Sequence, residues 1–472
     1  MKNRIHRLMS TNKKLRAFWR IVIVQLISFV GIHSTLIAQK VKWVSTSENA
    51  PWVEQPPLTL QTVLSQNLDS ALVLNIKATE QKIKGWGGCF NELGWKALLA
   101  LDEKDRDEAM KALFDPKEGS RFNICRTPMA ASDFALDAYS YDDVPGDYDM
   151  KGFSIDRDKK HLIPYIKAAL KINPNLKLWA SPWSPPAWMK TNNQYDSGSL
   201  RMESAILNAY AHYQAKYVLE YKKAGINITQ IHPQNEPIME TKYPSCKWDN
   251  PETMNNYIKN YLGPTFVKEK IPAQIWLGTI TNKDTNWFKH ILDDKETMKY
   301  VSGLGLQYNS RFVLSFLRRQ TNLPMMETET KCYNGKNSWK EADDTYGQMK
   351  QYINGGCQAY MYWNMVLDET GLSSWAWSQN SSITIDTKAK KVIYNPQFYV
   401  MKHFSRFVSP GAYLLKNENK DSSALSFINP DGSVVVVVEN KKQEKPFSIV
   451  IGNKTVTATL AASSFNTFII DK

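Results

Sequence analysis

Two glutamates in the second half of the sequence have the type and spacing needed to cleave a glycosidic bond. Glu236 follows Gln234-Asn235, and Glu329 ends the run Met325–Glu329. They are 93 residues apart, about three βα repeats, so they would stand on the fourth and seventh strands and face each other across a barrel mouth. Two such carboxyl groups can act as general acid/base and nucleophile on a sugar.

Other predicted strand ends carry residues that suit the same chemistry. Asn235 could donate a hydrogen bond to a sugar 2-hydroxyl, and Arg126 could keep a nucleophile ionised, because a nearby cation lowers a carboxyl pKa. Tryptophans at the third and eighth strand ends, including Trp183 and Trp363, offer flat walls and indole N–H donors to a sugar ring. Together these strand ends predict a carbohydrate-hydrolysing site.

Each of these residues also has a purely structural interpretation. Glu327 lies on the same strand face as Glu329, so it could be the functional acid, or both could support the site from behind. Arg126 and Asp133 could form a structural ion pair, and residues 235–237 could be only a turn or helix start.

Between about residues 80 and 400, short β-rich runs alternate with amphipathic helical stretches, which predicts parallel βα units. Eight strands are expected, at Lys82–Gly85, Phe122–Arg126, Leu176–Ala180, Ile228–His232, Gln274–Gly278, Gly303–Gln307, Met325–Glu329 and Tyr360–Asn364. Helices are expected at Asp102–Phe114, Lys159–Asn173 and Met202–Ala224, the last with a tyrosine stripe that should pack against the sheet. The fold class is therefore α/β, a (β/α)8 TIM barrel.

Both ends of the chain read as strands without helices. After residue 405 the runs are Ala424–Ile428, Ser433–Glu439, Phe447–Ile451, Thr455–Leu460 and Ser464–Ile470, and before the barrel they are Lys40–Val44 and Ala71–Ile76. Five strands alone would leave open edges, which the N-terminal strands could cover. We expect a side β-sandwich built from residues 40–78 and 405–472, beside a catalytic barrel of residues 79–404.

Residues 1–39 have the features of a secretory signal. They hold seven basic and no acidic side chains, then a mostly apolar run of about a dozen residues and a small-residue site. A retained membrane anchor is the alternative, but the run is shorter than the roughly 20 residues that a bilayer needs. The expected product is exported, to the periplasm, the cell surface or the medium, without stable membrane insertion after cleavage.

Composition excludes several other classes of function. Of the net charge of +13, seven units belong to the signal segment, and no basic block resembles a nucleic-acid footprint. The five cysteines show no CxxC spacing, and the histidines are dispersed, so neither a disulfide scaffold nor a metal site is expected. No phosphate or dinucleotide loop is present, and no cofactor is predicted.

The motifs, taken together, resemble glycoside hydrolase family 30, which contains glucosylceramidases and related bacterial and fungal β-glycanases. The matching segments are 85–88 with 91–92, 125–129 with 132–134, 181–190, 234–237, 328–329, 362–364, 402–411 and 430–437. The resemblance implies a barrel with a β-sandwich fed by both termini, and hydrolysis with retention of configuration.

The resemblance also assigns roles to residues. It implies that Glu236 is the acid/base and Glu329 the nucleophile, with the small Thr328 before it favouring Glu329 over Glu327. Retention would place the two carboxyl groups about 5–5.5 Å apart. The implied glucose-binding residues are Arg126, Asp133, Trp183, Asn235 and Trp363.

One departure from the family bears on the substrate. Glucosylceramidase-type members carry His-Trp-Tyr after the sixth strand, whereas this chain has Gln307-Tyr308-Asn309, so that Asn309 replaces the tyrosine beside the nucleophile. We include Gln307 and Tyr308 among the substrate-binding residues. The departure favours a β-1,6-glucan over a glucosylated lipid such as glucosylceramide, with xyloside or fucoside as lesser alternatives. A non-catalytic carbohydrate-binding protein is the alternative from another class.

Overall fold

The fold is taken from a computed structural model that describes residues 39–63, 71–417 and 423–472. The predicted signal segment, apart from Gln39, lies outside these residues. No helix within the described ranges combines the length and apolar character required to cross a bilayer.

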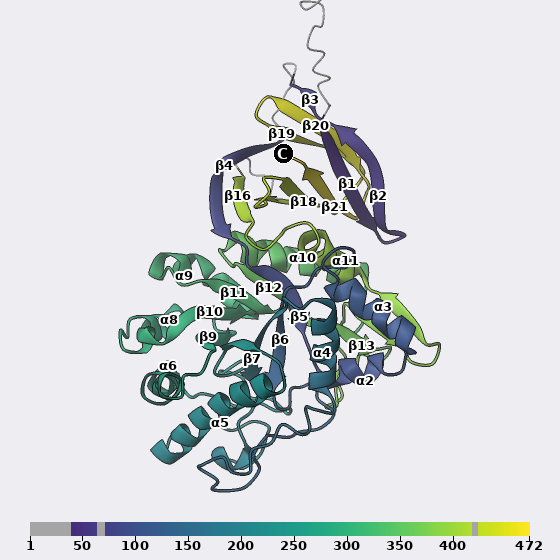
Figure 1. The fold of residues 1–472 in the computed structure, drawn as a ribbon. Helices are drawn as coiled ribbons and strands as arrows, with labels where there is room; N and C mark the ends of the chain where they lie inside the picture. The colour runs from purple at the N-terminus through teal and green to yellow at the C-terminus, as the bar shows by residue number, and fades with distance from the viewer. Residues whose placement is uncertain (1–38, 64–70, 418–422) are drawn as a thin grey trace, which may run out of the picture. The chain divides into compact units, whose positions relative to one another are not determined.

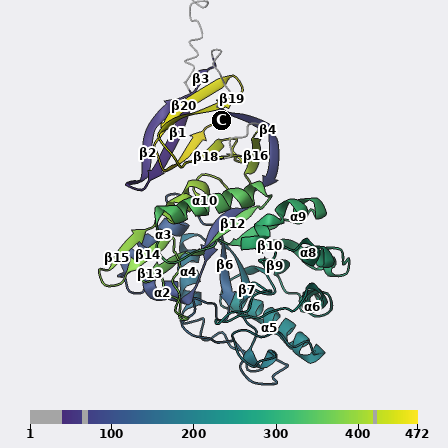
Figure 2. The ribbon, with the colours of Figure 1, turned by 180° about the vertical axis from the view of Figure 1, so that it is seen from behind.

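Eight parallel strands form a barrel sheet (Figures 1 and 2). They are β5 (Gly85–Cys89), β6 (Ile124–Met129), β7 (Lys177–Pro182), β8 (Ile228–Ile231), β9 (Gln274–Ile280), β10 (Val301–Gln307), β11 (Met325–Glu329) and β12 (Ala359–Asn364). Hydrogen-bonded neighbours follow the order β11-β10-β9-β8-β7-β6-β5-β12. This confirms the predicted TIM barrel.

The first strand lies later than the sequence suggested, at Gly85–Cys89 rather than Lys82–Gly85. Its glycines are needed because the neighbouring backbone leaves no room for a side chain. A Cβ atom on Gly87 would lie 1.7 Å from the carbonyl oxygen of Ile124, and one on Gly88 would lie 2.9 Å from that of Tyr362. The glycines therefore permit the neighbouring strands to pack closely.

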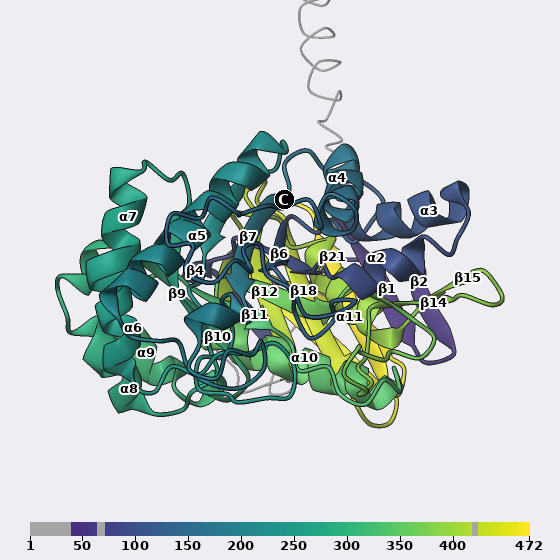
Figure 3. The same cartoon turned by 90° about the horizontal axis from the view of Figure 1, so that it is seen from below.

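Helices surround these strands, as the view in Figure 3 shows. They are α2 (Glu92–Leu98), α3 (Glu103–Phe114), α4 (Leu162–Ile172), α5 (Ser204–Lys223), α6 (Pro251–Tyr257), α7 (Gly263–Lys268), α8 (Thr285–Leu292), α9 (Leu314–Gln320), α10 (Trp339–Asn354) and α11 (Pro396–Ser405). The tyrosine stripe of α5 is buried in the core, as its period predicted.

A ten-stranded mixed sheet combines both ends of the chain. Its N-terminal strands are β1 (Lys40–Ser47), β2 (Ala50–Thr59), β3 (Gln61–Thr62) and β4 (Leu72–Lys82). Its C-terminal strands are β16 (Tyr413–Asn417), β17 (Ala424–Ile428), β18 (Val434–Asn440), β19 (Lys445–Ile451), β20 (Lys454–Leu460) and β21 (Ser464–Ile470). The first strand pairs with the last, with Val41 opposite Ile470. The sequence did not predict β2, β3 or β16.

The ten-stranded sheet has a hydrophobic core of its own and also contacts the barrel helices. The Tyr346 hydroxyl on α10 donates to the carbonyl oxygen of Val437 on β18. His403 on α11 forms hydrogen bonds with Thr46 on β1 and Thr467 on β21, at 2.9 and 2.7 Å. One helix of the barrel thus contacts strands from both ends of the chain.

A small third sheet follows the last barrel strand. It consists of β13 (Val366–Asp368), β14 (Ile383–Asp386) and β15 (Lys391–Tyr394), and the sequence did not predict it. The connection between β13 and β14 contains Trp377, whose ring contacts that of Tyr243 from the loop after β8, with 4.7 Å between ring centroids.

Candidate active site

Glu236 lies in an ordered extension beyond the end of β8. The backbone N–H of Asn235 donates to Pro182 on β7, and that of Glu236 donates to Thr279 on β9, at 2.8 and 3.0 Å. Glu236 has a φ of 47°, in the left-handed region that non-glycine residues rarely adopt. The neighbouring strand ends therefore hold this glutamate in an uncommon backbone conformation, as is often found at functional sites.

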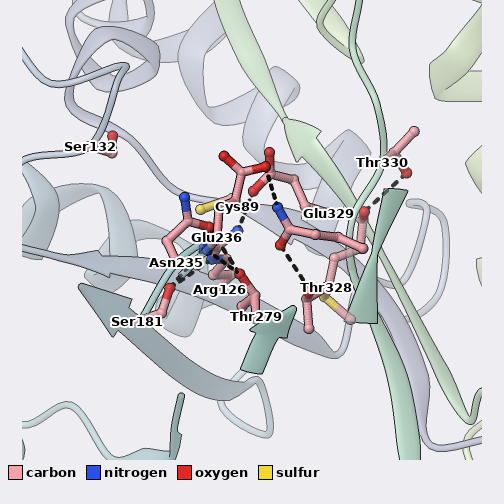
Figure 4. Close-up of polar contacts among 12 residues, drawn as sticks. Cys89, Arg126, Ser132, Ser181, Asn235, Glu236, Thr279, Thr328, Glu329 and Thr330 are labelled. Carbon is pink, nitrogen blue, oxygen red and sulfur yellow. Dashed lines mark hydrogen bonds and ion pairs between the residues drawn. The ribbon is translucent and has the colours of Figure 1, made fainter. Parts of the chain in front are cut away.

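Glu329 is the last residue of β11 and lies beside Glu236 (Figure 4). Arg126 on β6 forms an ion pair with it, with 2.5 Å between Nη1 and Oε2. The Tyr308 hydroxyl donates a hydrogen bond to the other carboxylate oxygen. Both partners of Glu329 stabilise its ionised form.

Arg126 is fully buried and joins several parts of the site. Its Nη2 donates to the Ser181 hydroxyl at 2.7 Å and to Asn235 Oδ1 at 2.6 Å. Its guanidinium carbon lies 4.2 Å from the ring centroid of Trp183, a distance typical of a cation–π contact. These contacts fix the cation that faces Glu329.

Hydrogen bonds to its side-chain oxygen fix the orientation of the Asn235 amide group. Its Oδ1 accepts hydrogen bonds from Arg126 and from the Thr279 hydroxyl, the latter at 3.0 Å. Within the described part of the chain its Nδ2 donates to no residue, so it remains available to a substrate hydroxyl.

A cavity of about 350 Å³ contains both glutamates, a size within the usual range for small-molecule sites. Four of the predicted substrate-binding residues line it, namely Asp133, Trp183, Asn235 and Tyr308. The other three, Arg126, Gln307 and Trp363, lie behind its wall and contact residues that line it.

Asp133 does not form the ion pair with Arg126 that was one interpretation of the sequence. Its Oδ1 is buried and has no hydrogen-bond partner among the described residues. Glu92 fixes the loop that carries Asp133, because it accepts a hydrogen bond from the backbone of Leu136 at 2.8 Å and pairs with Arg157. Asp133 lines the cavity, where a carboxyl group is suited to bind sugar hydroxyls.

The two glutamates differ in their electrostatic surroundings. Burial raises the pKa of Glu236, and the charge of Glu329 raises it further. Hydrogen bonds from Gln307, whose Nε2 lies at 3.1 Å, and from Tyr243, with the charge of Arg126, oppose this rise in pKa only in part. Burial also raises the pKa of Glu329, and the charge of Arg126 and the hydrogen bonds from Tyr308 and Arg126 offset this only in part. Glu236 is consequently the better proton carrier, and Glu329 the better anion.

Glu327 is not part of the cavity wall. It is fully buried, and its two oxygens accept hydrogen bonds from the backbone N–H groups of Glu329 and Met361, each at 3.0 Å. Of the two acids on β11, only Glu329 reaches the cavity.

Several cavity residues carried no signal in the sequence. Tyr243, Thr281, Lys331, Cys332 and Tyr333 come from the loops after β8, β9 and β11. Loop side chains follow no periodicity, so only the Tyr243-Pro244 pair, a plausible turn, could have drawn attention.

The five described cysteines are all buried and unpaired.

Comparison with known proteins identifies the family. The TIM-barrel domain of glycosyl hydrolase family 30 matches residues 83–408, and the β-sandwich domain of the same family matches residues 415–468. The chain belongs to glycosyl hydrolase family 30.

Relatives in family 30 include proteins named for two substrates. "Putative glucosylceramidase 1" of Caenorhabditis elegans is 31% identical over 82% of this chain and 78% of its own length. Endo-1,6-beta-D-glucanase neg1 of Aspergillus fumigatus is 25% identical over 76% of this chain and 79% of its own length. The crystal structure of SrfJ from Salmonella typhimurium superposes with a TM-score of 0.83 at 26% identity, covering 92% of this chain and all of SrfJ.

Membership in family 30 makes this chain an O-glycosyl hydrolase, and the interpretation as a non-catalytic sugar-binding protein is set aside. Its sandwich domain corresponds to the ten-stranded sheet, which confirms that both chain ends contribute to the second domain.

The structure corrects the expectation that Asn309 leaves the nucleophile without a tyrosine neighbour. Tyr308 contacts Glu329 directly. The register of β10 against β11 shifts between Leu306 and Gln307, and Tyr308 has a φ of 48°. Both irregularities break the alternation of side chains, so the consecutive residues Gln307 and Tyr308 reach Glu236 and Glu329 respectively.

Proposed function

We propose that the protein is a retaining β-glucoside hydrolase in which Glu236 is the acid/base and Glu329 the nucleophile. The observation that carries this assignment is the asymmetry of their partners. Glu329 forms an ion pair with a guanidinium, whereas Glu236 contacts an amide and the phenol of Tyr243 and forms no ion pair with any described residue. A nucleophile must be ionised before attack, and an acid must hold a proton at the same pH.

In the first step, a Glu329 oxygen bonds to the anomeric carbon while the bond to the leaving oxygen breaks, and Glu236 donates its proton to that oxygen. The product is a glycosyl ester of Glu329. In the second step, Glu236 takes a proton from water, whose oxygen bonds to the anomeric carbon and displaces Glu329. Esterification removes the charge of Glu329, so the pKa of Glu236 falls between the two steps and the same group can then act as a base.

The cavity would hold the glucosyl ring. Asn235 Nδ2 is placed to donate to the 2-hydroxyl, a contact that strengthens in the transition state, and Asp133 to accept from hydroxyls farther around the ring. Trp183 provides a flat apolar wall.

The substrate is proposed to be a β-linked glucoside, either a β-1,6-glucan or a glucosylated lipid such as glucosylceramide. Sequence alone favoured the glucan through Asn309, but Tyr308 removes that argument. The higher identity with "Putative glucosylceramidase 1" favours the lipid. Xylosides and fucosides are lesser candidates.

Parallel product analysis would separate the two substrates. The chain lacking residues 1–39 would be incubated with pustulan, a β-1,6-glucan, and with a short-chain glucosylceramide. Glucose from the lipid alone identifies a glucosylceramidase, and sugars from pustulan alone identify a glucanase. Proton NMR of the first sugar released should show the β-anomer, and release of the α-anomer would contradict retention.

We further propose that residues 1–39 direct export. Their composition supports this, with a basic segment followed by an apolar run. The N-terminus of protein recovered from the periplasm or medium should lie close to Gln39, and an intact N-terminus in the cytoplasm would contradict export.

A further inference from the structure

The barrel sheet has a seam between β11 and β12, the two strands at the ends of its order. Among the described residues, these strands share one isolated bridge, between Met325 and Cys357, and a backbone bond from Thr330 to Met361 at 2.9 Å. Every other neighbouring pair in the barrel is joined within the sheet order, although β5 and β6 share only the pair Cys89–Arg126. Because Glu329 is the last residue of β11, the seam lies beside it. The position of the proposed nucleophile thus depends on how β11 is held at this seam.

Glu327 spans this seam with its side chain. One of its oxygens accepts from the backbone N–H of Glu329 on β11, and the other accepts from that of Met361 on β12, each at 3.0 Å. A single carboxyl group thus accepts hydrogen bonds from the backbone of both strands at the seam.

Such an arrangement carries a free-energy cost. Glu327 is fully buried and forms no ion pair with any described residue, and its surroundings include the phenols of Tyr352 and Tyr360 and the thiol of Cys357. Burying a carboxyl group without a cation is unfavourable unless hydrogen bonds compensate for the lost water. A leucine or methionine would fill the space at lower cost but would remove both of these hydrogen bonds.

We propose that Glu327 is a positioning residue, which sets the place of Glu329 by holding its backbone N–H and tying β11 to β12. This inference rests on the proposed role of Glu329 as nucleophile. Displacement of a reacting group by about 1 Å can lower a rate 100-fold, so a contact to the backbone of the nucleophile has a large effect on turnover.

The test replaces Glu327 by glutamine, which keeps the size and one acceptor but presents an N–H group to the other backbone donor. The probe is an activated 2-deoxy-2-fluoro-β-glucoside, which accumulates as a glycosyl ester on the nucleophile. We expect E327Q to slow formation of this ester roughly 10- to 100-fold with little change in the half-saturating concentration of the probe.

Thr330→Val is the matched control. It removes another side-chain bond across the same seam, from the Thr330 hydroxyl to the Met361 carbonyl oxygen at 3.1 Å, and leaves the N–H of Glu329 untouched. T330V should lower the melting temperature but label within about threefold of the wild-type rate. Equal slowing in T330V and E327Q would overturn the proposal, because it would mean that seam stability alone matters.

Normal labelling by E327Q would also overturn it. If E327Q does not fold, E327D, which keeps a carboxyl group but is one methylene shorter, should show the same slowing to a smaller degree, and a wild-type labelling rate in E327D would contradict the proposal. Peptide mapping of the labelled wild type tests the role of Glu329 separately from the role of Glu327. A label on a residue other than Glu329 refutes the proposed function itself, whatever Glu327 does.

Discussion

The division of roles between the two glutamates depends on the immediate neighbours of each. Gln307 and Tyr308 are consecutive in sequence, yet one meets Glu236 and the other meets Glu329. Of the two glutamates, only Glu329 is paired with a guanidinium, and this cation favours the proton on Glu236.

Replacing Glu236 by glutamine should change the pH dependence of the reaction. Burial and the charge of Glu329 raise the pKa of Glu236, so in the wild type kcat/KM falls as pH rises through that pKa and the acid is lost. With an aryl glucoside whose leaving group needs no proton, E236Q should keep a measurable first step and show no basic limb. A basic limb that persists in E236Q would assign the acid to another group.

Replacing Tyr308 by phenylalanine tests the corrected interpretation of the 307–309 segment. Loss of a hydrogen bond to a charged carboxylate costs about 1.5–3 kcal/mol, so kcat/KM should fall roughly 10- to 100-fold. Because the phenol lowers the pKa of Glu329, the acidic limb of kcat/KM should move to higher pH in Y308F. Asn309→Ala should have the smaller effect, and the reverse order would restore Asn309 as the partner of Glu329.

Loops hold the cavity in shape, and a buried lysine joins two of them. Lys190, from the loop after β7, donates through Nζ to the carbonyl oxygens of Tyr195 and Asp196 in its own loop and of Ser245 after β8, at 2.8, 3.3 and 2.5 Å. Tyr243, two residues before Ser245, lines the cavity.

Replacing Lys190 by methionine should destabilise the protein by about 2–4 kcal/mol, because three carbonyl groups lose a charged donor. Lys247→Met in the same region removes only an exposed ion pair with Glu240 and should cost less than about 1 kcal/mol. Chemical denaturation of both variants measures this difference. Equal costs would show that Lys190 does not connect the loops.

The sequence predicted elements well where periodicity is strong, and poorly where geometry is irregular. Met325–Glu329 was placed correctly, because an apolar run ends in charged residues. The first barrel strand was placed too early, at Lys82–Gly85, because the reason for the glycines of β5, the close approach of Ile124, lies in another strand. The Tyr308 contact depends on a register shift and a positive φ, which residue type does not reveal. The cavity residues Lys331 and Tyr333 have positions set by tertiary contacts alone.

In the molecule as a whole, the barrel and the ten-stranded sheet share buried polar contacts as well as apolar ones. His403 lies between Thr46 and Thr467, so one imidazole bonds to strands from the beginning and the end of the chain. Burial lowers the pKa of His403 to about 3 from its ordinary value of 6.5.

This lowered pKa predicts acid sensitivity of the sheet's attachment. Between pH 6.5 and 3 the unfolded chain binds a proton at His403 that the folded one does not, so stability falls as pH falls through this window. The loss should reach about 2–3 kcal/mol at pH 4.5. His403→Gln should cost stability at pH 7, and thermal unfolding should show that this cost is smaller at pH 4.5. The same cost at both pH values would contradict the prediction.

The pairing of β1 with β21 also governs the order in which the protein can be assembled. Trp43 and Asn466, joined by a hydrogen bond across these strands, are 423 residues apart in sequence. During synthesis β1 emerges early, but its partner is among the last segments to leave the ribosome, so its edge stays open throughout translation. A nascent chain that is kept unfolded until translation ends does not present this unpaired edge to other chains. Transport through a secretion channel requires the same unfolded state. Cutting the chain at either end would damage the same sheet.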